Sequence, residues 1–435
     1  MIKIIKDTIK MIMQHAVLPV VYRIACMTNR VDKKLAVFAD AHNKSCPVYM
    51  RSLAAELKKR GYKVRGFFYD APTLKLMCGF MKAYAKAGTV VISDNFLPVA
   101  SCRKRKKTKV VQLWHGCGAY KKFGYDTEDD IPAYYKGNVY KNYDLVTVSS
   151  KHCERFFETA MRAEKGVVRA VGVPATDVLM SNAWLEKAKQ RFYEAYPEAV
   201  GKRIVLWAPT FRGRVGEGSE CCSCGECCKR ASDVTGKKRF DARCSIISND
   251  ADKKRSDARC SITPDDTDKD MPGAEYIERL AKFNDVYLVR HVHPHSKRME
   301  SGGCTAGKDK EKDSDIKGEG GQPDIYTLIA AADLLITDYS SVCYDYALTG
   351  KPIIFFVTDL EEYRAKRGFY MDLEELAWPV VTDEERIVTE VAKVLATGKC
   401  EGSVTREAFL EKYMSACDGR ATKRVADIID DWNDK

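Results

Sequence analysis

The stretch Asp333–Asp372, DLLITDYSSVCYDYALTGKPIIFFVTDLEEYRAKRGFYMD, decides the fold class of this chain. An apolar run at 334–336 predicts a buried strand, and Gly350 and Pro352 close the helix-length segment that follows it. A second apolar run at 353–357 predicts another strand. Strand, helix and strand in this order form a βαβ unit, which pairs its strands in parallel. Polar residues gather where the first strand ends, and this is the end of the sheet at which α/β proteins bind ligands.

The same alternation of strands and helices runs through the rest of the chain. Helix-length segments at 48–60, 74–86 and 183–196 lie between short apolar runs that end in polar or turn residues. Such alternation predicts a doubly wound parallel sheet, and 435 residues fit two α/β domains of this kind. The predicted strands are 35–38, 64–69, 89–92, 110–114, 145–148, 168–171, 204–207, 286–289, 334–336 and 353–357.

The predicted domain boundaries are an N-terminal segment at 1–30, a first domain at 31–198 and a second domain at 199–435. Two polar stretches, about 214–270 and 300–322, interrupt the second domain. Both are rich in Gly, Asp and Lys and lack apolar periodicity, which is typical of insertions. The first insertion also carries a near-duplicate, KKRFDARCSI followed by KKRSDARCSI.

Composition and charge narrow the class of protein. The chain is 45% hydrophobic and 31% charged, as in a globular protein, and its net charge of +11 favours an anionic partner. That partner can be nucleic acid, an acidic membrane surface or a phosphorylated substrate. The 17 cysteines are scattered without a secretory signal, so reduced cytosolic thiols are expected. The cluster at Cys221–Cys228 holds overlapping CxxC pairs that zinc or an iron–sulfur cluster can use, but the usual second pair is missing and no metal is predicted.

The N-terminal segment predicts an amphipathic helix. Lys3, Asp7, Lys10 and Gln14 recur at helical spacing and leave isoleucines and methionines on the broader face. This pattern is typical of a helix that lies in a membrane interface, and a helix packed on its own domain fits it equally. The basic run RKRKKTK at 103–109 is open to three interpretations: a solvated loop, a nuclear-type signal, or a contact with anionic lipid.

Polar or basic side chains follow four of the predicted strands. In two facing α/β domains these strand ends point into one cleft, where ligands commonly bind. Arginine, histidine and serine side chains suit phosphate oxygens, and a helix that begins near 340 adds free backbone N–H groups. A histidine between a strand and two nearby glycines can serve as a general base. The four strand ends carry His115; Thr210 and Arg212; Arg290 and His293; and Asp338 to Ser341.

The motifs at these strand ends together resemble the CDP-glycerol glycerophosphotransferases of teichoic acid synthesis. The resemblance covers roughly 35–430 outside the two insertions, and its carboxyl-terminal part is the most specific. The sequence contains no GxGxxG, Walker or HExxH pattern, which argues against a dinucleotide-binding enzyme, a nucleoside triphosphatase and a zinc protease. The motifs are WHG at 114–116, PTFR at 209–212, RxxHP at 290–294, TDYSSV…D at 337–345, KPIIFF at 351–356 and DLEEY…RGFY at 359–370.

This resemblance implies a GT-B-like architecture, two Rossmann-like domains around a cleft with the donor mainly on the second. It implies transfer of glycerol phosphate from CDP-glycerol to a hydroxyl of a lipid-linked saccharide or poly(glycerol phosphate) chain. CMP is released, no cofactor is expected besides the donor substrate, and the enzyme is expected at the cytoplasmic face of the cell membrane. A CDP-ribitol donor and a sugar-nucleotide glycosyltransferase are the alternatives on this fold. Nucleic acid is not an expected partner, because signatures such as an RRM or a zinc finger are absent.

The resemblance also implies roles for individual residues. His115 would be the base near the acceptor hydroxyl, and His293 with Arg290 would stabilise the charge on the transferring phosphate, as such a reaction requires. His291 is the alternative to His293. The donor side would comprise Thr210, Arg212, Thr337, Asp338, Ser340, Ser341, Asp345, Asp359, Tyr363 and Arg367. For three of these residues a local role is the alternative: hydrogen bonding for Asp345, packing for Tyr363 and loop anchoring for Arg367.

Overall fold

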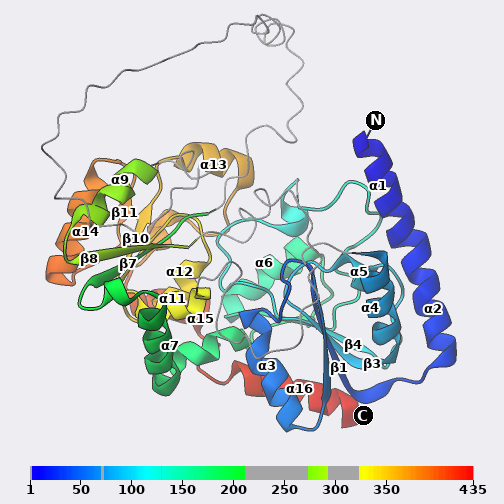
Figure 1. Ribbon diagram of the computed structural model, residues 1–435. Helices are drawn as coiled ribbons and strands as arrows, with labels where there is room; N and C mark the ends of the chain where they lie inside the picture. Colours follow the sequence, from blue (N-terminus) through cyan, green and yellow to red (C-terminus); the bar gives the residue numbers. More distant parts are fainter. Residues whose placement is uncertain (1, 70–72, 129, 211–272, 292–322, 435) are drawn as a thin grey trace, which may run out of the picture.

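The computed structural model describes residues 2–69, 73–128, 130–210, 273–291 and 323–434. These residues form two β-sheets in which every strand pairs in parallel with its neighbours. Helices cover both faces of each sheet (Figure 1). The predicted fold class, α/β with two Rossmann-like domains, is therefore confirmed.

The first sheet has six strands in the order β2-β1-β3-β4-β5-β6. Its central strands are nearly continuous apolar runs because both faces of the sheet are covered, and β3 is buried over its whole length. Since all strands run the same way, the ends of β1, β3 and β4 lie near one another. The elements are β1 (Asp32–Asp40), α3 (Val48–Lys59), β2 (Lys63–Phe68), α4 (Leu74–Lys86), β3 (Ala87–Ile92), α5 (Leu97–Ala100), β4 (Lys109–Gln112), β5 (Leu145–Thr147), α6 (Lys151–Met161), β6 (Val168–Arg169) and α7 (Asn182–Ala195).

The second sheet has five strands in the order β11-β10-β9-β7-β8. It contains the predicted βαβ unit, in which α12 joins the parallel pair β9 and β10. The register pairs Ala208 with Thr337, so the ends of β7 and β9 emerge side by side. The elements are β7 (Arg203–Ala208), α9 (Ala274–Glu278), β8 (Val286–Arg290), α11 (Ile325–Ala331), β9 (Leu334–Thr337), α12 (Val342–Ala347), β10 (Ile353–Phe356), α13 (Leu360–Arg367), β11 (Val380–Val381) and α14 (Arg386–Thr397).

The N-terminal segment forms α1 (Ile2–Ile12) and α2 (Leu18–Thr28), joined by a π-helical stretch at Met13–Val17. One face of this long helix packs on the first domain. The Gln14 amide donates a 2.6 Å hydrogen bond to the Leu97 carbonyl, and the Tyr22 ring lies 4.9 Å from the Tyr84 ring of α4. The stretch 4–28 is also long and apolar enough to cross a membrane by length and composition.

The basic run at 103–109 divides between two roles. Arg105 secures α2, because its backbone N–H donates to the Tyr22 hydroxyl and its guanidinium donates to the Ala85 carbonyl. Lys104 forms a 3.0 Å ion pair with Asp144. The side chains at 103, 106 and 107 are exposed, so only part of the run is available to a solvent or lipid surface.

Where the sequence predicts a final helical region over roughly 406–432, the structure has two helices, α15 (Arg406–Met414) and α16 (Ala421–Asp434). The turn between them includes Gly419 at a φ of +81°, and the Ala416 N–H donates a 2.9 Å hydrogen bond to the Ser149 carbonyl of the first domain. Contact with the other domain therefore redirects the chain. Helix α6 and the short strand β11 are further elements that the sequence analysis missed.

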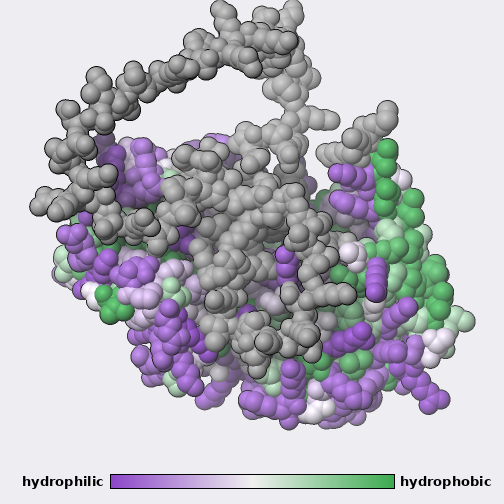
Figure 2. Space-filling model, viewed as in Figure 1, coloured by the Kyte–Doolittle hydropathy of each residue, from purple (hydrophilic) through white to green (hydrophobic). Residues whose placement is uncertain are grey.

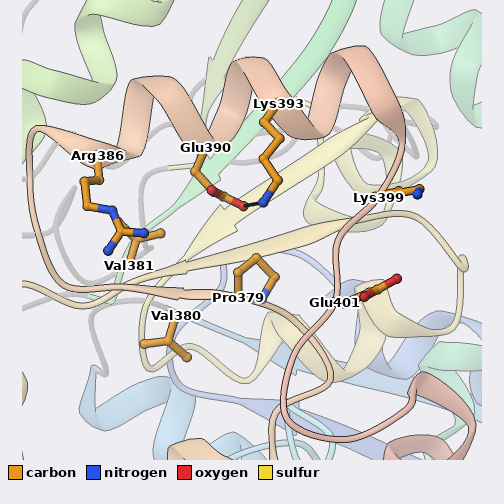
Figure 3. Close-up of a pocket in the computed structure, with 8 residues that line it drawn as sticks. All are labelled: Pro379, Val380, Val381, Arg386, Glu390, Lys393, Lys399 and Glu401. Carbon is orange, nitrogen blue, oxygen red and sulfur yellow. Dashed lines mark hydrogen bonds and ion pairs between the residues drawn. The ribbon is translucent and has the colours of Figure 1, made fainter.

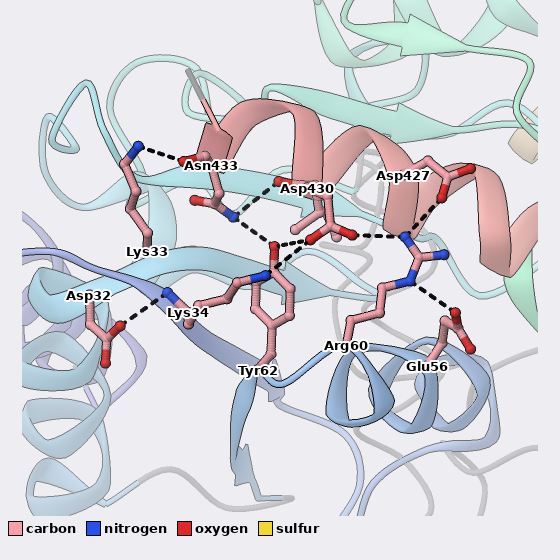
Figure 4. A network of polar contacts seen from close by, with 10 residues as sticks. Asp32, Lys33, Lys34, Glu56, Arg60, Tyr62, Asp427, Asp430 and Asn433 are labelled. Atoms are coloured by element: carbon pink, nitrogen blue, oxygen red, sulfur yellow. Dashed lines mark hydrogen bonds and ion pairs between the residues drawn. The ribbon is translucent and has the colours of Figure 1, made fainter.

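After this turn, α16 returns to the first domain and lies beside α3 (Figure 1). Arg60 at the end of α3 holds it there, donating hydrogen bonds of 2.8 Å to Asp427 and 2.9 Å to Asp430 (Figure 4). The Tyr62 hydroxyl donates to the other oxygen of Asp430, and the Asn433 amide donates to that hydroxyl. The last helix thus belongs in space to the first sheet, although it follows the second in sequence.

Candidate active site

The loop after β4 packs directly against α12 of the second domain. A Cβ atom added at Gly116 would lie 2.5 Å from the Ser341 hydroxyl oxygen. At Gly118, where φ is +66°, it would lie 2.2 Å from the Tyr344 ring. No larger residue fits at such distances, so both glycines permit the close approach of the two domains. The WHG and TDYSS motifs are brought together at this contact.

His115 sits at the edge of this contact with its side chain 42% exposed. The preceding Trp114 has a left-handed backbone with φ of 60°, a conformation that costs a non-glycine residue about 1–2 kcal/mol. The Trp114 N–H donates to the Gln112 side chain at 2.9 Å, and its ring packs against His115 at 4.8 Å and Phe123 at 4.9 Å. These contacts hold the strained turn that presents the imidazole.

The imidazole of His115 lies close to the loop that follows β3. Its Nδ1 atom is 3.3 Å from the Ser93 carbonyl oxygen and 3.8 Å from an Asp94 carboxylate oxygen. Asp94 is not among the site residues predicted from the sequence. The available signal was its place directly after a buried strand, at the same end of the sheet as His115.

On the second domain, Asp338 joins the ends of two strands. One carboxylate oxygen accepts hydrogen bonds from the Thr210 N–H at 2.8 Å, the Thr210 hydroxyl at 2.6 Å and the Tyr339 N–H at 2.6 Å. The Thr337 hydroxyl donates to the Ala208 carbonyl at 2.7 Å. The structure thus brings together three predicted donor-side residues, Thr210, Thr337 and Asp338, and shows them fixing the shape of the β7 and β9 ends.

Ser340 and Ser341 stand at the start of α12, and both are half-buried. The Ser340 carbonyl accepts from the Cys343 N–H, and its hydroxyl oxygen lies 3.4 Å from the Val342 N–H. Ser341 lies under the loop that carries His115, as its distance to Gly116 shows. The two serines and the histidine therefore occupy one junction between the domains.

Asp345 is buried on the inner side of α12. One of its carboxylate oxygens accepts hydrogen bonds from the Cys117 thiol at 3.4 Å and from the Tyr326 hydroxyl at 3.2 Å. Burial raises the pKa of Asp345 to about 7. This carboxylate links the loop of the first domain to α11 and α12 of the second.

The segment from Asp359 to Tyr370 forms a second contact between the domains. Arg367 pairs with Asp130 of the first domain at 2.7 Å and donates to the Lys122 carbonyl at 3.0 Å. Backbone hydrogen bonds join Lys122 to Gly368 at 3.2 Å and Tyr370 to Tyr120 at 2.9 Å. Arg367 therefore ties this segment to the opposite domain.

Asp359 and Tyr363 both contact Tyr339, the residue that follows Asp338. The Tyr339 hydroxyl donates a 3.0 Å hydrogen bond to Asp359, and the rings of Tyr339 and Tyr363 stack with centroids 4.2 Å apart. Phe369 continues the stack at 5.8 Å from Tyr363. These side chains pack the rim of the junction around the strand end at 338.

Arg290 is the last residue of β8, and its guanidinium carbon lies 4.6 Å from the centre of the Trp207 ring. The N–H of the next residue, His291, donates a 2.9 Å hydrogen bond to the Trp207 carbonyl. Arg212 and His293 lie outside the described residues, as does the cysteine cluster at Cys221–Cys228. Their predicted roles stay predictions.

Two further observations bear on what this site can hold. In the described part of the chain, His, Cys, Asp and Glu side chains form no group of three or more that could hold a metal ion.

A pocket of about 390 Å³ lies away from the domain junction, beside β11 and α14 (Figure 3). Within it Lys393 donates to Glu390 at 3.0 Å, and none of the predicted site residues lines it.

Comparison with known proteins gives this geometry a context. Over 363 residues the chain is 28% identical to a teichoic acid ribitol-phosphate primase of Bacillus spizizenii, covering 82% of this chain and 78% of that protein. It is 25% identical to the teichoic acid glycerol-phosphate primase of Bacillus subtilis over 351 residues, or 78% and 73% of the two chains. Among solved structures, the wall teichoic acid polymerase TagF superposes with a TM-score of 0.64 at 17% identity, covering all of this chain and 98% of that one, which supports the shared fold.

A family model also matches most of the chain. The model for the CDP-glycerol:poly(glycerophosphate) glycerophosphotransferases aligns with residues 20–223 and 273–431, which include both sheets and the junction between them. The chain belongs to this glycerophosphotransferase family.

Proposed function

We propose that this chain transfers glycerol phosphate from CDP-glycerol to a hydroxyl of a membrane lipid-linked saccharide or poly(glycerol phosphate) chain, in teichoic acid or related polymer synthesis. The observation that carries the proposal is the apposition of the His115 loop and the start of α12, where Gly116 lies against Ser341. Family membership supplies the donor class. A base from one domain and hydroxyl and amide donors from the other thus meet at one place.

This arrangement suits attack of an alcohol on phosphorus. His115 would accept the proton of the acceptor hydroxyl while the oxygen bonds to the phosphorus that carries glycerol. The bond from that phosphorus to the CMP phosphate breaks, and CMP leaves. Donors at Ser340, Ser341 and Arg290 would stabilise charge on the phosphate oxygens, which is the main electrostatic need of such a step.

A second donor, CDP-ribitol, is a candidate because of one specific observation. The relative with 28% identity over 82% of this chain is a ribitol-phosphate primase. Ribitol and glycerol differ in the length of the polyol, whereas the phosphate chemistry at the junction is the same for both. The choice of donor would therefore depend on the residues that contact the polyol part of the substrate.

The test is incubation of the full-length protein with CDP-glycerol, CDP-ribitol or UDP-sugars and a lipid-linked acceptor, with release of nucleotide measured. CMP release from CDP-glycerol is expected, and release of UDP without CMP would overturn the proposal. His115→Ala should lower turnover by ~10²–10⁴-fold, the usual contribution of a general base. His152→Ala is the matched control, because this half-buried histidine lies in α6 and packs against Tyr413 of α15.

We also propose that the N-terminal helix attaches the enzyme peripherally to the inner face of the cell membrane. The inner face of its second half, α2, packs on α4, while α1 and α2 both expose large apolar side chains in a stripe that is visible in green at the right of the molecule (Figure 2). Ile4 is 71% exposed and Met27 is 86% exposed. The helix thus packs on its own domain through one face, and the exposed stripe is the face that would meet the membrane. The stripe comprises Ile4, Ile5, Ile9, Ile12, Val20, Ile24 and Met27.

Because one face is held by the domain, the helix is expected to lie in the interface and not to cross the bilayer. Sedimentation with vesicles that contain anionic lipid tests this arrangement. The wild-type protein should pellet with the vesicles, and a variant with Ile9→Asp and Ile24→Asp should stay in the supernatant. Val200→Asp, at an apolar position that is 65% exposed and lies shortly before β7, is the matched control. Equal binding of all three proteins would exclude the attachment by this face.

A further inference from the structure

A cluster of polar side chains lies behind His115, where β1, β3 and β4 end. The Asp94 carboxylate after β3 has one oxygen 3.3 Å from Nε2 of His42 and 3.8 Å from Nδ1 of His115. Nδ1 of His115 is also 3.3 Å from the Ser93 carbonyl oxygen. One carboxylate therefore faces two histidines that come from different strand ends.

The surroundings of His115 select one tautomer of its imidazole. Both atoms near Nδ1, the Ser93 carbonyl oxygen and the Asp94 carboxylate oxygen, are hydrogen-bond acceptors. A neutral imidazole carries one proton, so Nδ1 holds it and the lone pair lies on Nε2. A separation of 3.8 Å exceeds hydrogen-bond length, but catalytic hydrogen bonds are often long before substrate binds. In this tautomer Nε2 is the nitrogen that can accept a proton.

The Asp94 carboxylate is itself held in position. Its second oxygen accepts from the Asn95 N–H at 2.6 Å, and its backbone carbonyl accepts from the Gln112 amide at 2.9 Å. The same Gln112 side chain accepts the hydrogen bond from the Trp114 N–H. One side chain therefore fixes both the loop that carries Asp94 and the turn that presents His115.

A buried carboxylate on β1 supports the other side of the cluster. Asp40 accepts hydrogen bonds from the Ser93 hydroxyl at 2.9 Å and from the His42 N–H at 2.8 Å. The strand ends of β1, β3 and β4 are thus cross-linked by side chains. Rigid support of this kind is what keeps a catalytic group in its productive orientation.

We propose that Asp94 is a positioning residue for His115 and that His42 holds the Asp94 carboxylate in place. The inference rests on the proposed role of His115 as base. During transfer the acceptor hydroxyl gives its proton to Nε2, its oxygen bonds to phosphorus, and CMP leaves with the electrons of the broken P–O bond. The Nδ1 proton stays on the ring and points to Asp94, whose negative charge stabilises the imidazolium formed in this step.

The experiment compares Asp94→Ala and Asp94→Glu in the full-length enzyme with Asp32→Ala, a half-exposed carboxylate at the other end of β1. Asp94→Ala should lower kcat at least about tenfold, and by less than the ~10²–10⁴-fold of losing the base. The KM for CDP-glycerol should change less than about twofold, since the donor contacts the other domain. Asp94→Glu should recover part of the lost kcat, and Asp32→Ala should behave as wild type.

The second readout does not depend on activity. In protein labelled with ¹⁵N-histidine, the His115 resonances, assigned with His115→Asn, should report an imidazole protonated at Nδ1. Asp94→Ala should move His115 toward the other tautomer. An unchanged tautomer, or a kcat within twofold of wild type, would overturn the positioning role. If the wild-type enzyme releases no CMP but the tautomer responds to Asp94, the proposed function fails and the positioning role stands.

Discussion

Replacing Asp345 by asparagine is expected to stabilise the protein, and to do so more strongly as the pH rises. Burial raises the pKa of Asp345 to about 7, from an ordinary value of 3.8. Between these two values the folded protein binds a proton that the unfolded chain has released. Folding stability from this group is therefore fully present below pH 3.8 and is lost as the pH rises through 7.

The size of the effect follows from this difference in pKa. Each pH unit is worth about 1.4 kcal/mol, so the interval of roughly three units corresponds to about 4 kcal/mol at pH 8. About two of these units lie between pH 5 and pH 7, where the loss is close to 3 kcal/mol. Asparagine is neutral throughout and keeps an oxygen that can accept from Cys117 and Tyr326, so it avoids this loss while preserving the hydrogen bonds.

The assay is thermal unfolding of the wild type and Asp345→Asn at pH 5 and pH 8. For domains of this size 1 kcal/mol moves Tm by about 2–4 °C, so the advantage of the variant should grow by about 6–12 °C between the two pH values. Asp431→Asn, an exposed position in α16, is the control and should show no such growth. An advantage that is equal at both pH values would refute the reasoning, because it would mean that Asp345 releases its proton in the folded protein as easily as in the unfolded chain.

Three other substitutions test the contacts that join the domains. Arg367→Ala removes the pair with Asp130, which is half-buried, and should cost about 1–3 kcal/mol of domain association, measured as faster hydrogen exchange at 120–122. Gly118→Ala places a Cβ against Tyr344 at a positive φ and should lower both Tm and turnover; a variant with wild-type Tm and turnover would contradict the close approach. Arg60→Ala removes the cation that joins Asp427 and Asp430 of α16 to the end of α3, and it should expose α16 to hydrogen exchange before the rest of the first domain, whereas uniform exchange would argue against this role.

The sequence was sufficient for the fold because the pattern that encodes it is local. Apolar runs followed by polar residues predicted ten strands, and the helix at 74–86 has the predicted bounds. Local pattern fails where a contact with the other domain decides the conformation. The turn that separates α15 from α16 is held by Ser149, which lies more than 260 residues earlier in the chain.

Only part of the candidate site could be predicted from the sequence. Motif resemblance selected His115 and the residues near Ser341, which the structure brings to one junction. It did not select Asp94, since a single aspartate after a strand is an ordinary sequence feature. Its relation to His115 appears only when β3 and β4 are placed side by side, and that neighbour relation follows from the strand order of the sheet.

The contacts of the motif residues separate two causes by which a substitution can abolish activity. Asp338 and Arg367 both belong to motifs of the donor side, yet the structure shows Asp338 fixing the end of β7 and Arg367 binding the opposite domain. Loss of either side chain would move the junction, so a fall in kcat/KM alone would not identify a contact with substrate. Asp345 is the informative case, because Asp345→Asn is expected to strengthen folding. If this stabilised variant loses turnover at pH 8, the loss cannot come from a weakened fold, and the charge of Asp345 must be needed for the reaction itself.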